Sequence, residues 1–235
     1  MLKYLANNQR PQEILRRHMQ SVCRPAYKER RQPTATEIVR AHLPYLDAFI
    51  EESLRFAPTI PLLFRQTTTD TDIQGTPIPK NMIVFIALRG PGMTESTVAP
   101  GLSSPQGPAI GRVGTWNEED IASFKPERWL KYKGQTLDAT GGVVITMARD
   151  EDMSLQHLEY DSLAGPMLSF SVGARGCMGR RLAYLEMRFI IALLVWNFVF
   201  ADCPPEVSSY DVVDELTTKP KHCFAKLALV ELETS

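Results

Sequence analysis

The chain has 235 residues, 44% hydrophobic and 23% charged, which are ordinary values for a soluble globular protein with one large domain or two small ones. Its 26 basic and 27 acidic residues give a net charge of −1, which argues against a nucleic acid as partner. The four cysteines form no C-x-x-C pair, so we expect neither a zinc site nor a disulfide framework.

The N-terminal segment lacks the features of a signal peptide, and the first predicted element is a helix that begins near Pro11. Apolar residues then recur at helical spacing on one face, which also carries His18. A packed or surface histidine explains His18 better than a metal ligand does. Thr34 or Thr36 is expected to cap a short second helix.

A third helix is predicted over residues 43–56, where Pro58 ends it and an apolar stripe marks its inner face. The stripe consists of Leu46, Phe49, Ile50, Ser53 and Leu54. Residues 62–69, 72–73 and 82–87 are predicted as short strands, with turns at Gly75 and residues 77–79. These strands indicate a small sheet and not a βαβ repeat.

Residues 89–115 contain many glycines and prolines without periodicity, which predicts a long loop. Order is expected to resume at Trp116, to continue through residues 124–129, and to lapse again near residues 134–142. The tail, residues 217–232, is predicted to form one or two strands.

A last long helix is predicted from near Cys177 to about Phe200, with Leu182, Leu185, Phe189, Leu193 and Trp196 on one face. Residues 182–201 are almost long enough to span a bilayer. Glu186 and Arg188 interrupt this segment, however, and each charge near mid-membrane would cost ~2.5–3.5 kcal/mol. A buried core helix is therefore favoured over a transmembrane segment.

The most informative stretch is residues 170–179, FSVGARGCMG, a glycine-rich loop that brings one cysteine to the start of that helix. The unpaired backbone N–H groups of a helix N-terminus favour a thiolate over a thiol. Gly173, Gly176 and Gly179 permit positive φ angles and the close approach of a flat ligand. Arg175 can bind an anionic group beside the sulfur, and Phe170 can shield the sulfur from water. For a lone cysteine, a buried thiol in a tight turn would be the better interpretation.

The spacing Phe-x-x-Gly-x-Arg-x-Cys-x-Gly resembles the cysteine-ligand loop of the cytochrome P-450 family. Two further segments agree with this resemblance, in the family's order. Glu52-Ser53-Leu54-Arg55 resembles its Glu-x-x-Arg helix, and Pro126-Glu127-Arg128-Trp129 resembles its Pro-Glu-Arg-aromatic segment. The resemblance implies a mainly α fold with small β-sheets, in which residues 1–235 form the C-terminal part of the family's domain.

The resemblance also implies a set of site residues and heme b as the cofactor. Cys177 would be the ligand of the heme iron. The heme-binding loop would further include Phe170, Gly173, Arg175 and Gly179. Arg65 matches a position that often binds a heme propionate, although a surface arginine is the alternative. Glu52, Arg55 and Arg128 would form a structural Glu-Arg-Arg network, in which a buried charge group specifies the fold.

No catalytic residue is assigned, because the family's central helix, with its oxygen-activating acid-alcohol pair, has no counterpart in this sequence. The N-terminal membrane anchor is likewise missing. We therefore expect the partial domain to be cytoplasmic or loosely membrane-associated, whereas full-length fungal-type members lie on the cytosolic face of the endoplasmic reticulum.

The resemblance implies a heme-thiolate monooxygenase that inserts one oxygen atom of O2 into a lipophilic substrate, in secondary metabolism, with electrons from an NADPH-dependent reductase. The alternative is a truncated, inactive remnant that binds heme weakly or not at all. A cysteine-nucleophile enzyme is disfavoured, since His18, His42, His157 and His222 all lie outside the cysteine loop.

Overall fold

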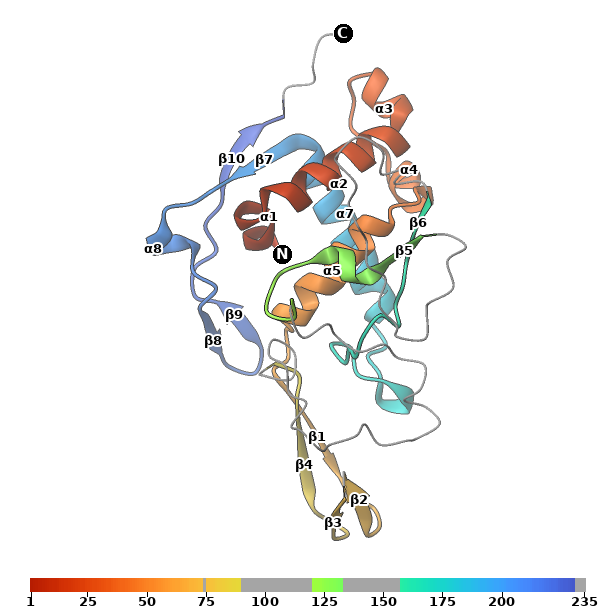
Figure 1. The fold of residues 1–235 in the computed structure, drawn as a ribbon, viewed down its shortest axis with the longest axis vertical. Helices are drawn as coiled ribbons and strands as arrows, with labels where there is room; N and C mark the ends of the chain where they lie inside the picture. Colours follow the sequence, from red (N-terminus) through yellow and green to blue (C-terminus); the bar gives the residue numbers. More distant parts are fainter. Residues whose placement is uncertain (74, 90–119, 133–156, 231–235) are drawn as a thin grey trace.

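The computed structural model describes residues 1–73, 75–89, 120–132 and 157–230, and it shows a mixed helical fold with small antiparallel sheets (Figure 1). In the described residues every sheet has two strands. Helix α5 (Pro44–Phe56) occupies the centre, and the hairpins built from β1 to β4 project from one end of the molecule (Figure 1). The sequence expectation of helices with small sheets is confirmed.

The N-terminal segment contains two helices where the sequence predicted one. They are α1 (Leu2–Asn7) and α2 (Gln9–Val22), separated by Asn8 with φ −132° and ψ 82°. Pro11 therefore lies in the third position of α2, where its missing N–H costs nothing because the first turn has no internal acceptor. A short helix, α3 (Arg24–Lys28), follows.

Thr34, and not Thr36, caps helix α4 (Ala35–Arg40). The backbone N–H of Glu37 donates to Thr34 Oγ1 at 3.2 Å, and the backbone N–H of Thr34 donates to Glu37 Oε2 at 2.7 Å. This reciprocal capping box satisfies two backbone donors that would otherwise lack partners.

Helix α5 is buried on nearly all sides, as expected of a helix at the centre of a core. Pro44 opens it, one residue later than predicted. All five residues of the predicted apolar stripe are buried, but so are Glu51, Glu52 and Arg55. The helix contacts α2, α7 (Arg180–Asn197) and the segments around residues 126–132 and 158–160.

The predicted strands form two separate hairpins. Strand β1 (Leu62–Gln66) pairs with β4 (Ile83–Ala87), and β2 (Thr71–Ile73) pairs with β3 (Thr76–Ile78). The turn prediction at residues 77–79 was wrong in part, because Pro77 lies within β3 opposite Asp72. A proline is tolerated there because a two-stranded ladder has only edge strands. Gly75 does form the turn, with φ +79°.

The rest of the described chain wraps around α5 and α7. A 3₁₀ turn, η2 (Pro126–Trp129), leads into β5 (Leu130–Tyr132), which pairs with β6 (Leu158–Tyr160). A second turn, η4 (Gly173–Arg175), precedes α7. The C-terminal elements that follow α7 are β7 (Phe198–Ala201), α8 (Pro205–Ser208), β8 (Val212–Asp214), β9 (Thr218–Pro220) and β10 (Lys226–Leu229). The predicted terminal strands correspond to β9, which pairs with β8, and β10, which pairs with β7.

Helix α7 differs from its prediction at both ends and on its face. It begins at Arg180 and ends at Asn197, because the next residues leave the helix to pair as β7 with β10. Its buried residues are Ile191, Ala192, Val195 and Trp196. Leu182 and Leu185 of the predicted inner face are exposed, by 60% and 39%. Among the described helices, none is both long and apolar enough to cross a membrane.

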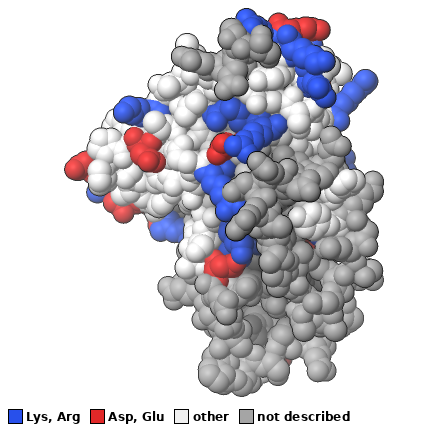
Figure 2. Space-filling view, turned by 45° about the horizontal axis from the view of Figure 1, so that its top comes forward, with Lys and Arg blue, Asp and Glu red and all other residues white. Residues whose placement is uncertain are grey.

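Several expectations lie outside the described residues. They are the predicted loop at residues 89–115 apart from Arg89, the resumption of order at Trp116, and the lapse at residues 134–142. Charged side chains are visible on one face of the molecule (Figure 2). Lys and Arg gather at its top and along its centre, and Asp and Glu lie beside both groups.

His18 is a buried histidine, only 1% exposed, and in the described structure neither ring nitrogen has a hydrogen-bond partner. Burial, with a smaller contribution from nearby His42, lowers its pKa from 6.5 to about 4. The unfolded chain therefore binds a proton at His18 below pH 6.5 that the folded chain does not bind until about pH 4. The stability present above pH 6.5 is lost as the pH falls through this window.

We expect His18→Leu to remove part of the acid sensitivity of the protein. Between pH 7 and pH 4 the free energy of unfolding of the unmodified chain should fall by about 2–3 kcal/mol more than that of His18→Leu. Urea unfolding at a series of pH values measures this difference. His157→Leu is the matched control, because His157 is exposed. Parallel pH profiles for the unmodified chain and His18→Leu would contradict the assignment.

Candidate functional site

Cys177 lies exposed at the end of a loop that closes on itself just before α7. Its backbone N–H donates to the carbonyl oxygen of Phe170 at 2.8 Å, and the N–H of Gly176 donates to the carbonyl of Gly173 at 3.0 Å. These bonds fix the backbone on both sides of the cysteine while the thiol stays open to solvent. The thiol of Cys177 is exposed, so it is not the buried thiol in a tight turn that was the alternative interpretation.

The three glycines of the loop serve different purposes, and only one adopts the predicted positive φ. Gly173 has φ +69°, a value that a side chain would disfavour. At Gly176 a Cβ atom would lie 3.1 Å from the carbonyl oxygen of Gly173, so a side chain would strain the turn. Gly179 has φ −80°, and a Cβ there would lie 3.8 Å from Cys177 Sγ. The absence of a side chain at Gly179 therefore leaves open space beside the sulfur.

Several residues near Cys177 in the sequence have exposed side chains. Cys177 is placed three residues before the first residue of α7, and its carbonyl oxygen accepts from the backbone N–H of Arg180 at 3.3 Å. Val172 precedes Cys177 in the sequence and Met178 and Leu182 follow it, and all three are exposed apolar side chains. Such a set of side chains is rarely left open to water unless it binds something. Arg175 is also exposed, next to this apolar set.

Arg65 joins the hairpin β1–β4 to the cysteine loop. Its Nη2 donates to Ser171 Oγ at 2.9 Å, and its Nη1 donates to the carbonyl of Phe64 at 2.8 Å. Arg65 is half-buried, and its role as a propionate ligand, with a surface arginine as the alternative, stays a prediction. The guanidinium thus lies at the loop, where an anionic group of a ligand could reach it.

The predicted Glu-Arg-Arg network is present and buried. Glu52 Oε1 accepts from Arg55 Nη2 at 2.9 Å and from Arg128 Nε at 3.0 Å, while its Oε2 accepts from Arg55 Nε at 2.9 Å. Glu52 and Arg55 are 0% exposed at their side chains and Arg128 is 6% exposed. Glu52 and Arg55 come from α5, and Arg128 comes from η2. The network therefore fixes η2 against the central helix.

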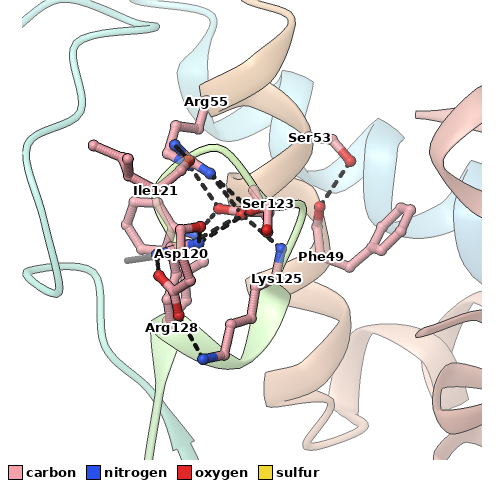
Figure 3. A network of polar contacts seen from close by, with 10 residues as sticks. Phe49, Ser53, Arg55, Asp120, Ile121, Ser123, Lys125 and Arg128 are labelled. Carbon is pink, nitrogen blue, oxygen red and sulfur yellow. Dashed lines mark hydrogen bonds and ion pairs between the residues drawn. The ribbon is translucent and has the colours of Figure 1, made fainter. Parts of the chain in front are cut away.

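Further groups that the sequence analysis missed complete this network (Figure 3). Trp129 Nε1 donates to Glu52 Oε2 at 2.9 Å, and the backbone N–H of Lys125 donates to Oε1 at 2.8 Å. Arg128 Nη1 donates to Asp120 Oδ1 at 2.8 Å, and Arg55 Nη1 donates to the carbonyl of Ile121 at 2.9 Å. Trp129 belongs to the quoted Pro-Glu-Arg-aromatic segment, so its aromatic position was a usable signal. Asp120 lies outside every motif.

A second buried carboxylate, also missed, lies one residue before the first. Glu51 Oε1 accepts from the hydroxyl of Tyr160 at 2.8 Å and from the hydroxyl of Tyr184. Tyr184 comes from α7, and its ring packs on that of Phe170 at a centroid distance of 5.1 Å. Ser169 Oγ, in the same loop, donates to the carbonyl of Leu54 at 3.5 Å. The cysteine loop is thus attached to α5 through several contacts.

The cytochrome P450 family model matches residues 1–95 and 119–226. The chain belongs to the cytochrome P450 family. The three predicted motifs of this P450 chain all lie within the matched residues: the cysteine loop, the helix with Glu52 and Arg55, and the segment with Arg128.

Cytochrome P450 monooxygenases of Fusarium and Dothistroma are among the relatives of this P450 chain. It is 39% identical to the cytochrome P450 monooxygenase TRI13 of Fusarium sporotrichioides over its whole length, which covers 39% of that protein. It is 35% identical to the Hps1-dma1 cluster cytochrome P450 monooxygenase cyp3.1 of Dothistroma septosporum, over 97% of this chain and 70% of that protein. The chain thus spans well under half of the Fusarium relative's length.

A solved structure supports the fold of the P450 chain. The crystal structure of a cytochrome P450 (CYP102L1) aligns with a TM-score of 0.63 and 24% identity. The alignment covers 97% of this chain and 40% of the solved one. The fold described above is therefore a part of the P450 fold, as the sequence resemblance implied.

Proposed function

We propose that this chain supplies the cysteine-bearing part of a heme-thiolate monooxygenase and that Cys177 is the ligand of the heme iron. The observation that carries the proposal is the exposed thiol of Cys177, held at the start of α7 by the bond from its N–H to Phe170. The buried Glu52 network fixes η2 against α5, and Glu51 on the same helix accepts from Tyr184, whose ring packs on Phe170 of the loop. Together these features favour a thiolate ligand presented on a rigid support.

The residues of the loop fit heme b in their chemistry. Cys177 would bind the iron, Gly173 and Gly179 would leave space for the ring, and Phe170 would limit the access of water to the sulfur. Arg65 and Arg175 would bind the propionates by charge-assisted hydrogen bonds. When bound to a thiolate, heme supplies the activation of dioxygen, because electron donation from sulfur favours O–O cleavage.

The substrate and the partners belong to the same proposal. A lipophilic organic substrate of secondary metabolism and an NADPH-dependent reductase are supported by the family and by the monooxygenase relatives. The name of the Dothistroma relative assigns that protein to the Hps1-dma1 cluster. For location, we propose attachment to the cytosolic face of the endoplasmic reticulum for full-length relatives and a cytoplasmic or loosely membrane-associated state for residues 1–235.

A second candidate function is a catalytically inactive remnant that binds heme weakly or not at all. One observation favours it: the chain matches only 39% of the Fusarium relative and 40% of the solved P450 chain. The two candidates differ in oxygen-consuming turnover with a reductase.

The test of iron ligation is the replacement of Cys177. Reduced, heme-loaded protein should give a carbon monoxide adduct with the red-shifted absorption of thiolate-bound heme, and Cys177→Ala or Cys177→His should abolish that absorption. Cys23→Ala, Cys203→Ala and Cys223→Ala are the matched controls and should retain it. An adduct spectrum that is the same with and without the Cys177 thiol would refute the ligand assignment.

A further inference from the structure

Two tyrosines donate to one buried carboxylate, and one of them, Tyr184, also packs on the cysteine loop. Glu51 is 4% exposed and lies on α5, and its Oε1 accepts from the hydroxyls of Tyr160 on β6 and Tyr184 on α7. The Tyr184 ring packs on Phe170 with an interplanar angle of 41°. The carbonyl of Phe170 in turn accepts from the N–H of Cys177.

This chain of contacts runs without a gap from the central helix to the sulfur-bearing residue. Burial, and then the negative charge of Glu51, raise the pKa of the Tyr184 phenol above its ordinary value. The hydroxyl therefore stays protonated and remains a donor to the carboxylate. Because a hydrogen bond from a neutral donor to a buried carboxylate is strong and directional, it restricts the Tyr184 ring and, through it, Phe170.

We propose that Glu51 and Tyr184 are positioning residues that hold Phe170, and through Phe170 the backbone of Cys177, in the geometry that iron ligation needs. The proposal rests on the assignment of Cys177 as the ligand, and it assigns to Glu51 a task separate from that of its neighbour Glu52. Glu52 fastens η2, whereas Glu51 fastens the cysteine loop. Tyr160 shares the carboxylate but serves the β5–β6 ladder.

The chain offers a matched pair of variants. Tyr184→Phe and Tyr160→Phe each remove one hydroxyl that donates to Glu51 Oε1, and each keeps the aromatic ring. The first readout is the rate at which iodoacetamide alkylates Cys177 in the heme-free 235-residue chain, followed by peptide mass spectrometry so that the other cysteines do not interfere. Tyr184→Phe and Glu51→Gln should each raise this rate about fivefold, and Tyr160→Phe should change it by less than about twofold.

A second pair of measurements separates positioning from general loosening. In a Phe170→Leu background, Tyr184→Phe should have no further effect on alkylation, because its route to Cys177 is already broken. In heme-loaded protein, the reduction potential of the iron should shift in Tyr184→Phe and stay constant in Tyr160→Phe. Urea unfolding gives the global stability of each variant for comparison.

The outcomes distinguish this proposal from the proposed function. Equal alkylation rates in the two tyrosine variants, or an effect of Tyr184→Phe that persists in the Phe170→Leu background, would overturn the positioning role. If the chain does not bind heme through Cys177, the alkylation experiment still decides whether Tyr184 positions the loop. If heme binds and the potentials of both tyrosine variants equal that of the unmodified protein, the positioning role fails while the ligand assignment stands.

Discussion

Replacing Glu52 by alanine is expected to destabilise the folded chain by about 3–5 kcal/mol, because Arg55 and Arg128 would be left as buried charges without their shared carboxylate. That loss is comparable to a large part of the whole stability of an ordinary domain. Arg55→Ala and Arg128→Ala should act in the same direction, since each removes a partner of the buried Glu52. The free energy of unfolding in urea measures the effect.

The exposed pair of Arg17 and Glu13 provides the matched control. Arg17 Nη2 and Glu13 Oε1 are 2.5 Å apart, and the two residues are four positions apart on one helix. Their side chains are 64% and 57% exposed. Glu13→Ala should change the free energy of unfolding by less than about 1 kcal/mol, because water solvates both charges. A loss of similar size in Glu13→Ala and Glu52→Ala would show that burial does not decide the effect.

The same variants separate a scaffold from a catalyst. If Glu52, Arg55 and Arg128 are structural, their replacement lowers the yield of folded, heme-loaded protein and reduces turnover only in proportion. Variants that load heme normally and yet lose turnover would instead assign these residues a role in the reaction. Heme content and turnover per heme give the answer, measured on the same preparations of the chain extended with the segment of a full-length relative.

Extending the chain is expected to have the second large effect. Residues 1–235 leave Phe64, Phe85 and Leu182 exposed by 68%, 67% and 60%, and Met178 beside the cysteine fully exposed. Exposed apolar surface of this kind promotes association, and an iron that remains wet exchanges ligands with water. We therefore expect the isolated chain to bind heme poorly, to aggregate and to give no coupled substrate oxidation.

Supplying the segment of a full-length relative that this chain does not match, fused or in trans, should restore heme loading and reductase-dependent product formation. Heme absorbance after gel filtration and product formed per NADPH consumed measure the two effects. The extended form carrying Cys177→Ala is the control, because it retains the added surface and lacks the ligand. Coupled product formation by the short chain at the rate of the extended form would contradict this prediction.

Much of the central fold could be predicted from local signals. Pro44 and the apolar stripe of α5 mark that helix, and short runs of apolar residues mark β1 and β4. The break at Asn8 has no such signal, since asparagine within a polar stretch is compatible with either state. The end of α7 at Asn197 is also hidden, because the sequence stays apolar into β7 and only pairing with β10 ends the helix.

The site shows the same division. Four residues could be found because they stand in motifs whose residue types and spacings resemble those of the family. They are Cys177, Glu52, Arg55 and Arg128. Helical periodicity predicted that Leu182 and Leu185 lie on a buried face, because an apolar stripe on a helix usually packs against another element. In this chain both side chains are exposed. The partners of Glu51 could not be found, because Tyr160 and Tyr184 lie far along the sequence and reach the carboxylate only in the folded chain.

The adjacency of Glu51 and Glu52 on α5 restricts which sequence changes the helix can accept. Successive residues of an α-helix point about 100° apart, so the two carboxylates address different neighbours although they are consecutive. A single-residue insertion or deletion between Pro44 and Glu51 would rotate both by that angle and direct Glu51 and Glu52 away from their present partners. A substitution of Glu51 or Glu52 therefore affects the hydrogen bonds of one carboxylate, whereas a change in the length of α5 would break the hydrogen bonds of both carboxylates at once.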